Sequence, residues 1–118
     1  MAVITSHLLN ATDGTHASGV KAEILSRADA VHYNTLFSGS TDDGGRLRVE
    51  IETQILKINK CCELVFHTGC YFLKNKSFGK NISVVPEIVI RLVLTNIDET
   101  YHCPLIISPN GYSIWWSS

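Results

Sequence analysis

The sequence has no surplus of charge of either sign and no long run of apolar residues. Its 118 residues include 10 Lys and Arg against 11 Asp and Glu, which gives a formal net charge of −1. Nucleic acid is held chiefly by a surplus of cationic side chains, so it is not an expected partner. The apolar stretches at 84–94 and 104–107 are interrupted or short, whereas a membrane-spanning helix needs about 20 apolar residues. No membrane span is therefore expected.

The sequence also lacks the short motifs that mark several large enzyme classes. It contains no Gly-x-Gly-x-x-Gly, no Walker loop, no His-Glu-x-x-His and no Gly-x-Ser-x-Gly. These absences argue against nucleotide-dependent enzymes, zinc proteases and serine hydrolases. The first residues do not form a basic and then apolar secretory leader, and the last three do not resemble Ser-Lys-Leu. We therefore expect a cytoplasmic location, with the peroxisome as the alternative.

Four cysteines are few for a disulfide framework in a chain of this size. With 45% hydrophobic residues the chain can build a core without covalent cross-links, so Cys61, Cys62, Cys70 and Cys103 are expected to be free thiols. Neighbours on a strand point to opposite faces, so the adjacent pair Cys61 and Cys62 does not suit zinc, and Cys103 cannot share a proton with His102. No metal or organic cofactor is expected.

The spacing of turn residues indicates an all-β fold. Gly, Pro, Asn and Asp clusters recur about every ten residues, a rhythm typical of a sandwich or barrel. In 87–95 the apolar residues alternate, which predicts a strand with one face in a core. A short helix is predicted at 70–77, and the whole chain, 1–118, is expected to form one domain. Strands are predicted at 3–9, 20–26, 32–38, 47–51, 62–68, 87–95, 104–108 and 112–116.

Three polar residues stand where a site could form. His7 lies in the first predicted strand, on the same face as Thr5 and Leu9. Arg46 directly follows an Asp-Gly-Gly turn, and His102 precedes a strongly apolar strand. Considered singly, each is more often a half-exposed or solvated surface side chain than a site residue.

Seven motifs, found in order over nearly the whole chain, favour a functional site over the surface interpretation of these three residues. They are Ile4-Thr-Ser-His-Leu-Leu-Asn, Gly19-Val-Lys-Ala-Glu-Ile, Thr41-Asp-Asp-Gly-Gly-Arg, Glu63-Leu-Val-Phe-His-Thr-Gly-Cys-Tyr-Phe, Val85-Pro-Glu-Ile, Tyr101-His-Cys-Pro-Leu-Ile-Ile-Ser-Pro and Gly111-Tyr-Ser. Together they resemble the 5-hydroxyisourate hydrolase branch of the transthyretin family. The resemblance implies a transthyretin-like two-sheet sandwich of seven to eight strands with one short helix, paired into dimers and then a homotetramer.

The resemblance also implies an activity. The hydrolase branch of the transthyretin family converts 5-hydroxyisourate to 2-oxo-4-hydroxy-4-carboxy-5-ureidoimidazoline, a step of urate degradation in purine metabolism. His7, Arg46 and His102 occupy the three diagnostic positions. By resemblance, the two histidines activate water and pass protons, and Arg46 holds the anionic substrate and the developing oxyanion. Arg48, on the same strand face as Arg46, is the alternative anion-holding residue.

The ending departs from the family pattern. Hydrolases of the family end in Tyr-Arg-Gly-Ser, where this chain has Trp115, Trp116, Ser117 and Ser118. Trp115 keeps an aromatic wall and one N–H donor for substrate but cannot accept a hydrogen bond. Ser118 retains a hydroxyl and, as the last residue, a carboxylate that would position water or a histidine.

Two other interpretations remain open. One is a transthyretin-like tetrameric binding protein for a small aromatic ligand or a protein partner, catalytically weakened by the altered ending. The other is a structural oligomer without a ligand. Convergence of His7, Arg46 and His102 on one pocket would favour the enzyme, because a carrier has no need of it.

Overall fold

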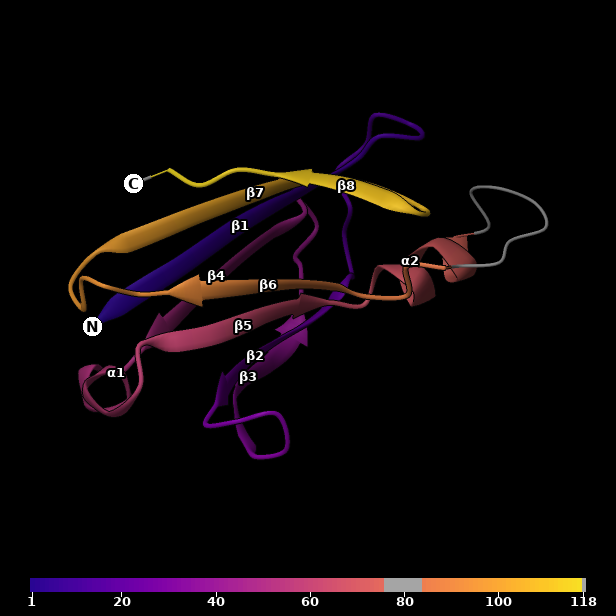
Figure 1. Ribbon diagram of the computed structural model, residues 1–118. Coiled ribbons are helices and arrows are strands. Elements are labelled where there is room, and N and C mark those ends of the chain that lie inside the picture. Colours follow the sequence, from indigo (N-terminus) through magenta and orange to yellow (C-terminus); the bar gives the residue numbers. More distant parts are fainter. Residues whose placement is uncertain (76–83, 118) are drawn as a thin grey trace.

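The computed structural model describes residues 1–75 and 84–117 and shows two packed β-sheets (Figure 1). One sheet has the strand order β4-β1-β7-β8 and the other β3-β2-β5-β6. The predicted transthyretin-like, two-sheet, all-β fold is confirmed. The strands are β1 (Ala2–Asn10), β2 (Lys21–Arg27), β3 (Tyr33–Ser40), β4 (Arg46–Ile51), β5 (Cys61–Phe66), β6 (Ile88–Val93), β7 (Thr100–Ser108) and β8 (Gly111–Ile114).

Two helices are described, one of which the sequence analysis predicts. Helix α2 (Thr68–Asn75) corresponds to the helix expected at 70–77, of which residues 76 and 77 lie outside the described part. Helix α1 (Thr53–Ile58) is additional. It is a short turn between β4 and β5 in which the Glu52 carbonyl accepts the N–H groups of Ile55 and Leu56. Burial of Leu56 against the core stabilises a helix that local propensity alone does not predict.

Alternation of apolar and polar residues decides which face of each strand is buried. In β1 the even-numbered residues are buried and the odd-numbered ones half-exposed, and in β4 buried and exposed residues alternate in the same way. The predicted core face of 87–95 is also confirmed, because Ile88 and Leu94 are buried while Ile90 and Leu92 pack against the core. The outer face of the β4-β1-β7-β8 sheet is therefore left for polar side chains.

All four cysteines are free thiols. Cys62 and Cys103 are buried, whereas Cys61 and Cys70 are exposed. Burial raises the pKa of Cys62 to about 12 and also raises the pKa of Cys103, so both thiols stay protonated at neutral pH. Among the described residues, no helix is long and apolar enough to cross a membrane.

Candidate functional site

The outer face of the β4-β1-β7-β8 sheet brings the predicted site residues together. Strand β1 lies between β4, which is antiparallel to it, and β7, which is parallel to it (Figure 1). Its residue His7 pairs with Arg46 of β4 on one side and with Pro104 of β7 on the other. Paired residues in adjacent strands share a face, so His7 and Arg46 are neighbours on the outer side of the sandwich.

A second row of side chains contains His102. Two residues before His7 in β1, Thr5 pairs with Arg48 of β4 and with His102 of β7. The Thr5 hydroxyl lies 2.8 Å from His102 Nδ1, which fixes the orientation of that ring. A groove of about 370 Å³ lies beside these two rows; Arg46 and His102 line it, whereas His7 is not among its lining residues. Its polar lining consists of Thr5, Ser6, Asp42, Arg46, Arg48 and His102.

The chain after β8 continues along β7 and reaches the same face (Figure 1). His102 and Ser117 exchange two backbone hydrogen bonds of 3.0 and 2.9 Å. The Trp115 N–H donates to the Pro104 carbonyl at 3.4 Å, which places Trp115 in the row of His7. Half of the Trp115 side chain is exposed. The remaining predicted site residue, Ser118, lies outside the described residues.

The two arginines of β4 differ in what they contact. The Arg48 guanidinium donates to the Glu50 carboxylate at 2.8 Å. Asp42 accepts the backbone N–H groups of Gly44 and Arg46, so it shapes the turn rather than neutralising a side chain. Within residues 1–75 and 84–117, the Arg46 guanidinium has no ion-pair partner. Arg46 is therefore the better placed of the two to hold an anion.

Gly45 permits the close approach of three chain segments beside the site. Its N–H and carbonyl lie at the turn into β4, and its carbonyl accepts the Leu8 N–H at 2.8 Å. Its φ of +73° is in the left-handed region, which non-glycine residues rarely adopt. A Cβ there would lie 2.6 Å from the Leu8 carbonyl oxygen and 3.1 Å from the Ala17 nitrogen. Only glycine fits without a shift of backbone.

His16, which the sequence analysis did not single out, contacts His7 directly. His7 Nε2 and His16 Nδ1 lie 2.9 Å apart, and the two rings stack with centroids 5.0 Å apart. The chain turns back after β1 and forms a bridge between Leu9 and His16, which places His16 beside β1 next to the point where β4 begins. An Asp13-Gly14 turn between the two histidines was the available sequence signal, since a tight return brings residue 16 alongside residue 9.

The surroundings of His7 favour its neutral form. Desolvation is the largest cause of a lowered pKa, followed by the positive charge of Arg46 and the neighbouring His16, with a smaller contribution from His102. A hydrogen bond from the His7 ring to the Gly44 carbonyl opposes this lowering. At neutral pH His7 is thus an unprotonated imidazole, the form that can accept a proton.

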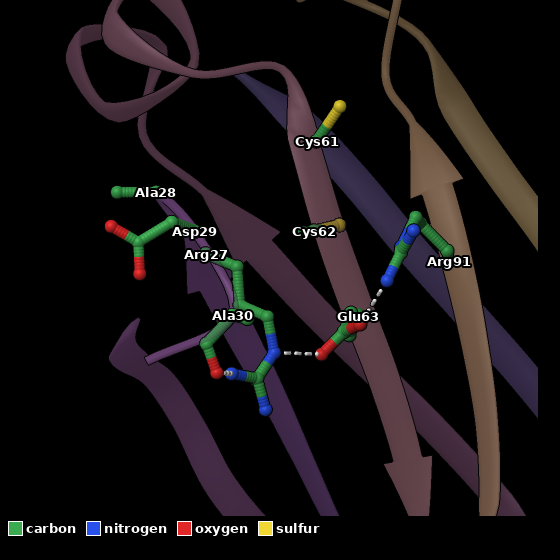
Figure 2. A pocket seen from close by; sticks show the side chains of 8 residues that line it. All are labelled: Arg27, Ala28, Asp29, Ala30, Cys61, Cys62, Glu63 and Arg91. Carbon is green, nitrogen blue, oxygen red and sulfur yellow. Dashed lines mark hydrogen bonds and ion pairs between the residues drawn. The ribbon is translucent and has the colours of Figure 1, made fainter. Parts of the chain in front are cut away.

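The other sheet carries a groove that is also lined by arginines, about 340 Å³ in volume (Figure 2). Here the buried Glu63 carboxylate accepts hydrogen bonds from Arg27 at 2.5 Å and from Arg91 at 3.1 Å. Figure 2 shows both guanidinium groups turned toward this carboxylate. Both guanidinium groups are thereby engaged by Glu63, whereas Arg46 has no such partner in the described residues, so this groove is a weaker candidate for an anion than the one beside Arg46. In the described part of the chain, no group of three or more His, Cys, Asp or Glu is arranged to hold a metal ion.

Comparison with known proteins places this arrangement in a family. A model described as the HIUase/Transthyretin family matches residues 4–116. The chain belongs to the HIUase/Transthyretin family. Curated members named 5-hydroxyisourate hydrolase include one from Halalkalibacterium halodurans, 30% identical over 115 residues, covering 98% of this chain and 97% of that protein. Another, from Caulobacter vibrioides, is 32% identical over 121 residues and covers 100% of both chains.

Solved structures of the HIUase/Transthyretin family share the fold. The structure of Klebsiella pneumoniae 5-hydroxyisourate hydrolase has a TM-score of 0.76 with 24% identity, covering 100% of both chains. Sea bream transthyretin in complex with thyroxine has a TM-score of 0.75 with 17% identity, covering 97% of this chain and 93% of that one. Both a hydrolase and a hormone-binding protein therefore resemble this chain in fold, and the site residues must distinguish them.

Replacing Gly45 by Ala should disturb the fold and the site together. The positive φ and the approach to the Leu8 carbonyl predict a loss of about 2–5 kcal/mol in the free energy of unfolding. Urea denaturation measures this loss. Gly14 also has a positive φ, of +76°, but a Cβ there meets nothing within 4 Å, so Gly14→Ala is the matched control and should cost less. Equal losses in the two variants would contradict the close-packing argument.

Replacing Arg46 by Gln should raise the pKa of His7 toward its usual value of 6.5, because a positive charge is removed. Titration of the His7 ring followed by NMR measures this change, with Arg48→Gln as the control. Because folding lowers the pKa of His7, the unfolded chain binds more protons than the folded chain near pH 6. The contribution of His7 to the free energy of unfolding is therefore full above pH 6.5 and is lost as the pH falls. Arg46→Gln should weaken that dependence. An unchanged or lower His7 pKa would contradict the assignment.

Proposed function

We propose that this protein hydrolyses 5-hydroxyisourate to 2-oxo-4-hydroxy-4-carboxy-5-ureidoimidazoline, a step in the degradation of urate. The observation that supports this most strongly is the meeting of His7, Arg46 and His102 on one sheet face beside a groove. Membership of the HIUase/Transthyretin family, and similarity over the full chain to proteins named 5-hydroxyisourate hydrolase, support the same function.

The substrate is a small, planar, electron-poor purine derivative. Opening its six-membered ring needs water added to a ring carbonyl and a proton given to the leaving nitrogen. Histidine suits both transfers near pH 7. With its lowered pKa, His7 accepts the proton from water, and His102, oriented by Thr5, is placed to return one. Arg46 holds the anionic substrate and stabilises the oxyanion that develops at the carbonyl.

The altered ending contributes to the same face. Trp115 lies in the row of His7, so its indole forms a flat wall against which a planar substrate can stack. Trp116 instead lies near the Tyr101 ring, with the centroids 6.3 Å apart. Ser118, which stands where the family pattern has its terminal serine, would supply a hydroxyl to position water or a histidine. The catalytic set is then His7, Arg46, His102 and Ser118, with Trp115 as a further substrate contact.

The outer face that carries the site also exposes apolar groups. Ile106 and Trp115 are both well exposed on it, and exposed apolar groups on one face are typical of a surface that a partner covers. A homotetramer built as a dimer of dimers would cover such groups and enclose the site, as the family membership also favours. Binding of a small aromatic ligand is the second candidate function, and the half-exposed Trp115 and Trp116 favour it. The hydrolase is favoured more by Arg46, which has no ion-pair partner in the described part of the chain, pairs with His7 and lines the same groove as His102.

Removal of either histidine should abolish most of the activity. Each proton-transfer role is worth about 10²–10⁴-fold in rate, so His7→Asn and His102→Asn should lower kcat by that range. Arg46→Lys should weaken substrate binding, because lysine lacks the planar fork of guanidinium. The assay generates 5-hydroxyisourate with uricase and follows its decay spectrophotometrically. His32→Asn is the matched control, since His32 is exposed and paired with Asp29. A wild-type protein that leaves the decay unaccelerated would overturn the proposed function.

Trp115→Tyr tests whether the altered ending still contacts substrate. A tyrosine keeps the aromatic wall and adds a hydroxyl that can accept a hydrogen bond, so kcat/KM should be held or raised. Trp115→Ala should instead raise KM, because stacking with the planar ring is lost. Trp116→Tyr is the control, since Trp116 lies against Tyr101 rather than in the row of His7. Wild-type kcat/KM in Trp115→Ala would show that this position does not contact the substrate.

A further inference from the structure

His16 forms a coupled pair with His7 that the function proposed above leaves unused. The two imidazoles share a hydrogen bond of 2.9 Å, and their planes stack at 28°. This contact contributes to the lowered pKa of His7, because His16 opposes a positive charge on the His7 ring. His16 is exposed and lies beside Leu9, on the side of His7 away from Thr5 and His102. Water therefore reaches the His16 ring directly, and the hydrogen bond joins that ring to His7.

The backbone, not the imidazole contact, positions His16. The loop after β1 is closed by a hydrogen bond from the Asn10 N–H to the Thr15 carbonyl at 2.8 Å. Asp13 accepts the Thr15 N–H at 3.0 Å, and the Ala17 N–H donates to the Leu8 carbonyl at 2.9 Å. Substitution of the His16 side chain therefore leaves the loop in place, which makes the pair accessible to mutation.

Either ring can donate in the shared hydrogen bond, because the roles of the two nitrogens depend on the tautomers. A neutral imidazole carries one N–H. The tautomer that can pass a proton to His7 has His16 Nδ1 as the donor and His7 Nε2 as the acceptor. In that tautomer His16 Nε2 is unprotonated.

We propose that His16 is a proton-relay residue of the hydrolysis proposed above, on which this inference rests. As the water O–H bond breaks, its proton forms a bond to His16 Nε2, while the His16 Nδ1 proton transfers to His7 Nε2. The hydroxide adds to the substrate carbonyl carbon, and the positive charge ends on His7. The nitrogen that takes the proton from water is therefore His16 Nε2 rather than a nitrogen of His7.

The charges around His7 make this transfer reversible. The titratable and charged groups facing it are Arg46 from β4, His102 from β7 and His16 from the loop. All three oppose a positive charge on His7. A proton that reaches His7 is therefore held weakly and returns readily through His16 when the leaving nitrogen or water accepts it.

Two substitutions separate a relay from a merely positioning contact. In His16→Asn the side-chain amide N–H can still donate to His7 Nε2, but the amide cannot take a proton from water. His16→Phe keeps a stacked ring and loses the hydrogen bond. A relay predicts that both variants lower kcat by about 10²-fold or more with little change in KM. His32→Asn should retain the wild-type kcat.

Each outcome decides between the alternatives. A wild-type kcat in His16→Asn overturns the relay. A loss of kcat that is confined to His16→Phe shows that His16 only orients His7. If the wild-type protein does not accelerate the decay at all, the proposed function is overturned and the relay with it. If the wild type is active and His16→Asn is equally active, only the relay is overturned.

NMR of the ring nitrogens gives a readout that a purely structural role would not change. The relay requires His16 protonated at Nδ1 and unprotonated at Nε2 in the resting protein. In His16→Asn the pKa of His7 should rise toward its usual value, because the neighbouring ring that lowers it is removed. The opposite tautomer of His16, or an unchanged His7 pKa in His16→Asn, would overturn the proposal.

Discussion

The pairing register of β1 between β4 and β7 is the constraint on which the rest of the site depends. It sets Arg46 beside His7, and His102 beside Thr5, although these residues come from distant parts of the chain. A slip of one residue would turn His7 into the core and Leu8 out to solvent. Because Ile4 and Leu8 are fully buried, the hydrophobic core itself holds the register. Packing free energy is thus what aligns the polar residues on the opposite face.

Electrostatic pairing then distinguishes one arginine-containing groove from the other. On the β3-β2-β5-β6 sheet, Arg27 and Arg91 are committed to Glu63, and the hydrogen bond from Arg27 is the largest cause of the lowered pKa of that carboxyl. On the β4-β1-β7-β8 sheet, Arg48 is paired with Glu50 while the turn built on Asp42 leaves the Arg46 side chain available. The positive charge of Arg46 lowers the pKa of His7 as well. In the proposed function, one guanidinium would thus hold an anionic substrate and keep the neighbouring base neutral.

Much of this could be predicted from the sequence, and the exceptions have physical reasons. Alternation and turn spacing predicted the all-β fold, and the motifs around His7, Arg46 and His102 predicted three residues that lie on one sheet face. Helix α1 was missed because burial of Leu56 stabilises it, which local sequence does not reveal. The contact of His16 with His7 was missed because alternation assigns a residue to a face without naming its neighbour across the sheet. That neighbour depends on where the chain turns back.

The most direct measurement uses the histidines themselves as probes of where a purine binds. Urate, a stable planar relative of 5-hydroxyisourate, is titrated into protein whose histidine rings are labelled with nitrogen-15, and each ring is followed by NMR. Three of the five histidines, His7, His16 and His102, belong to the proposed site, whereas His32 pairs with Asp29 and His67 with Glu23. The account predicts saturable shifts of His7, His16 and His102 together, with His32 and His67 unchanged. Shifts confined to His32 or His67, or none at saturating urate, would contradict it.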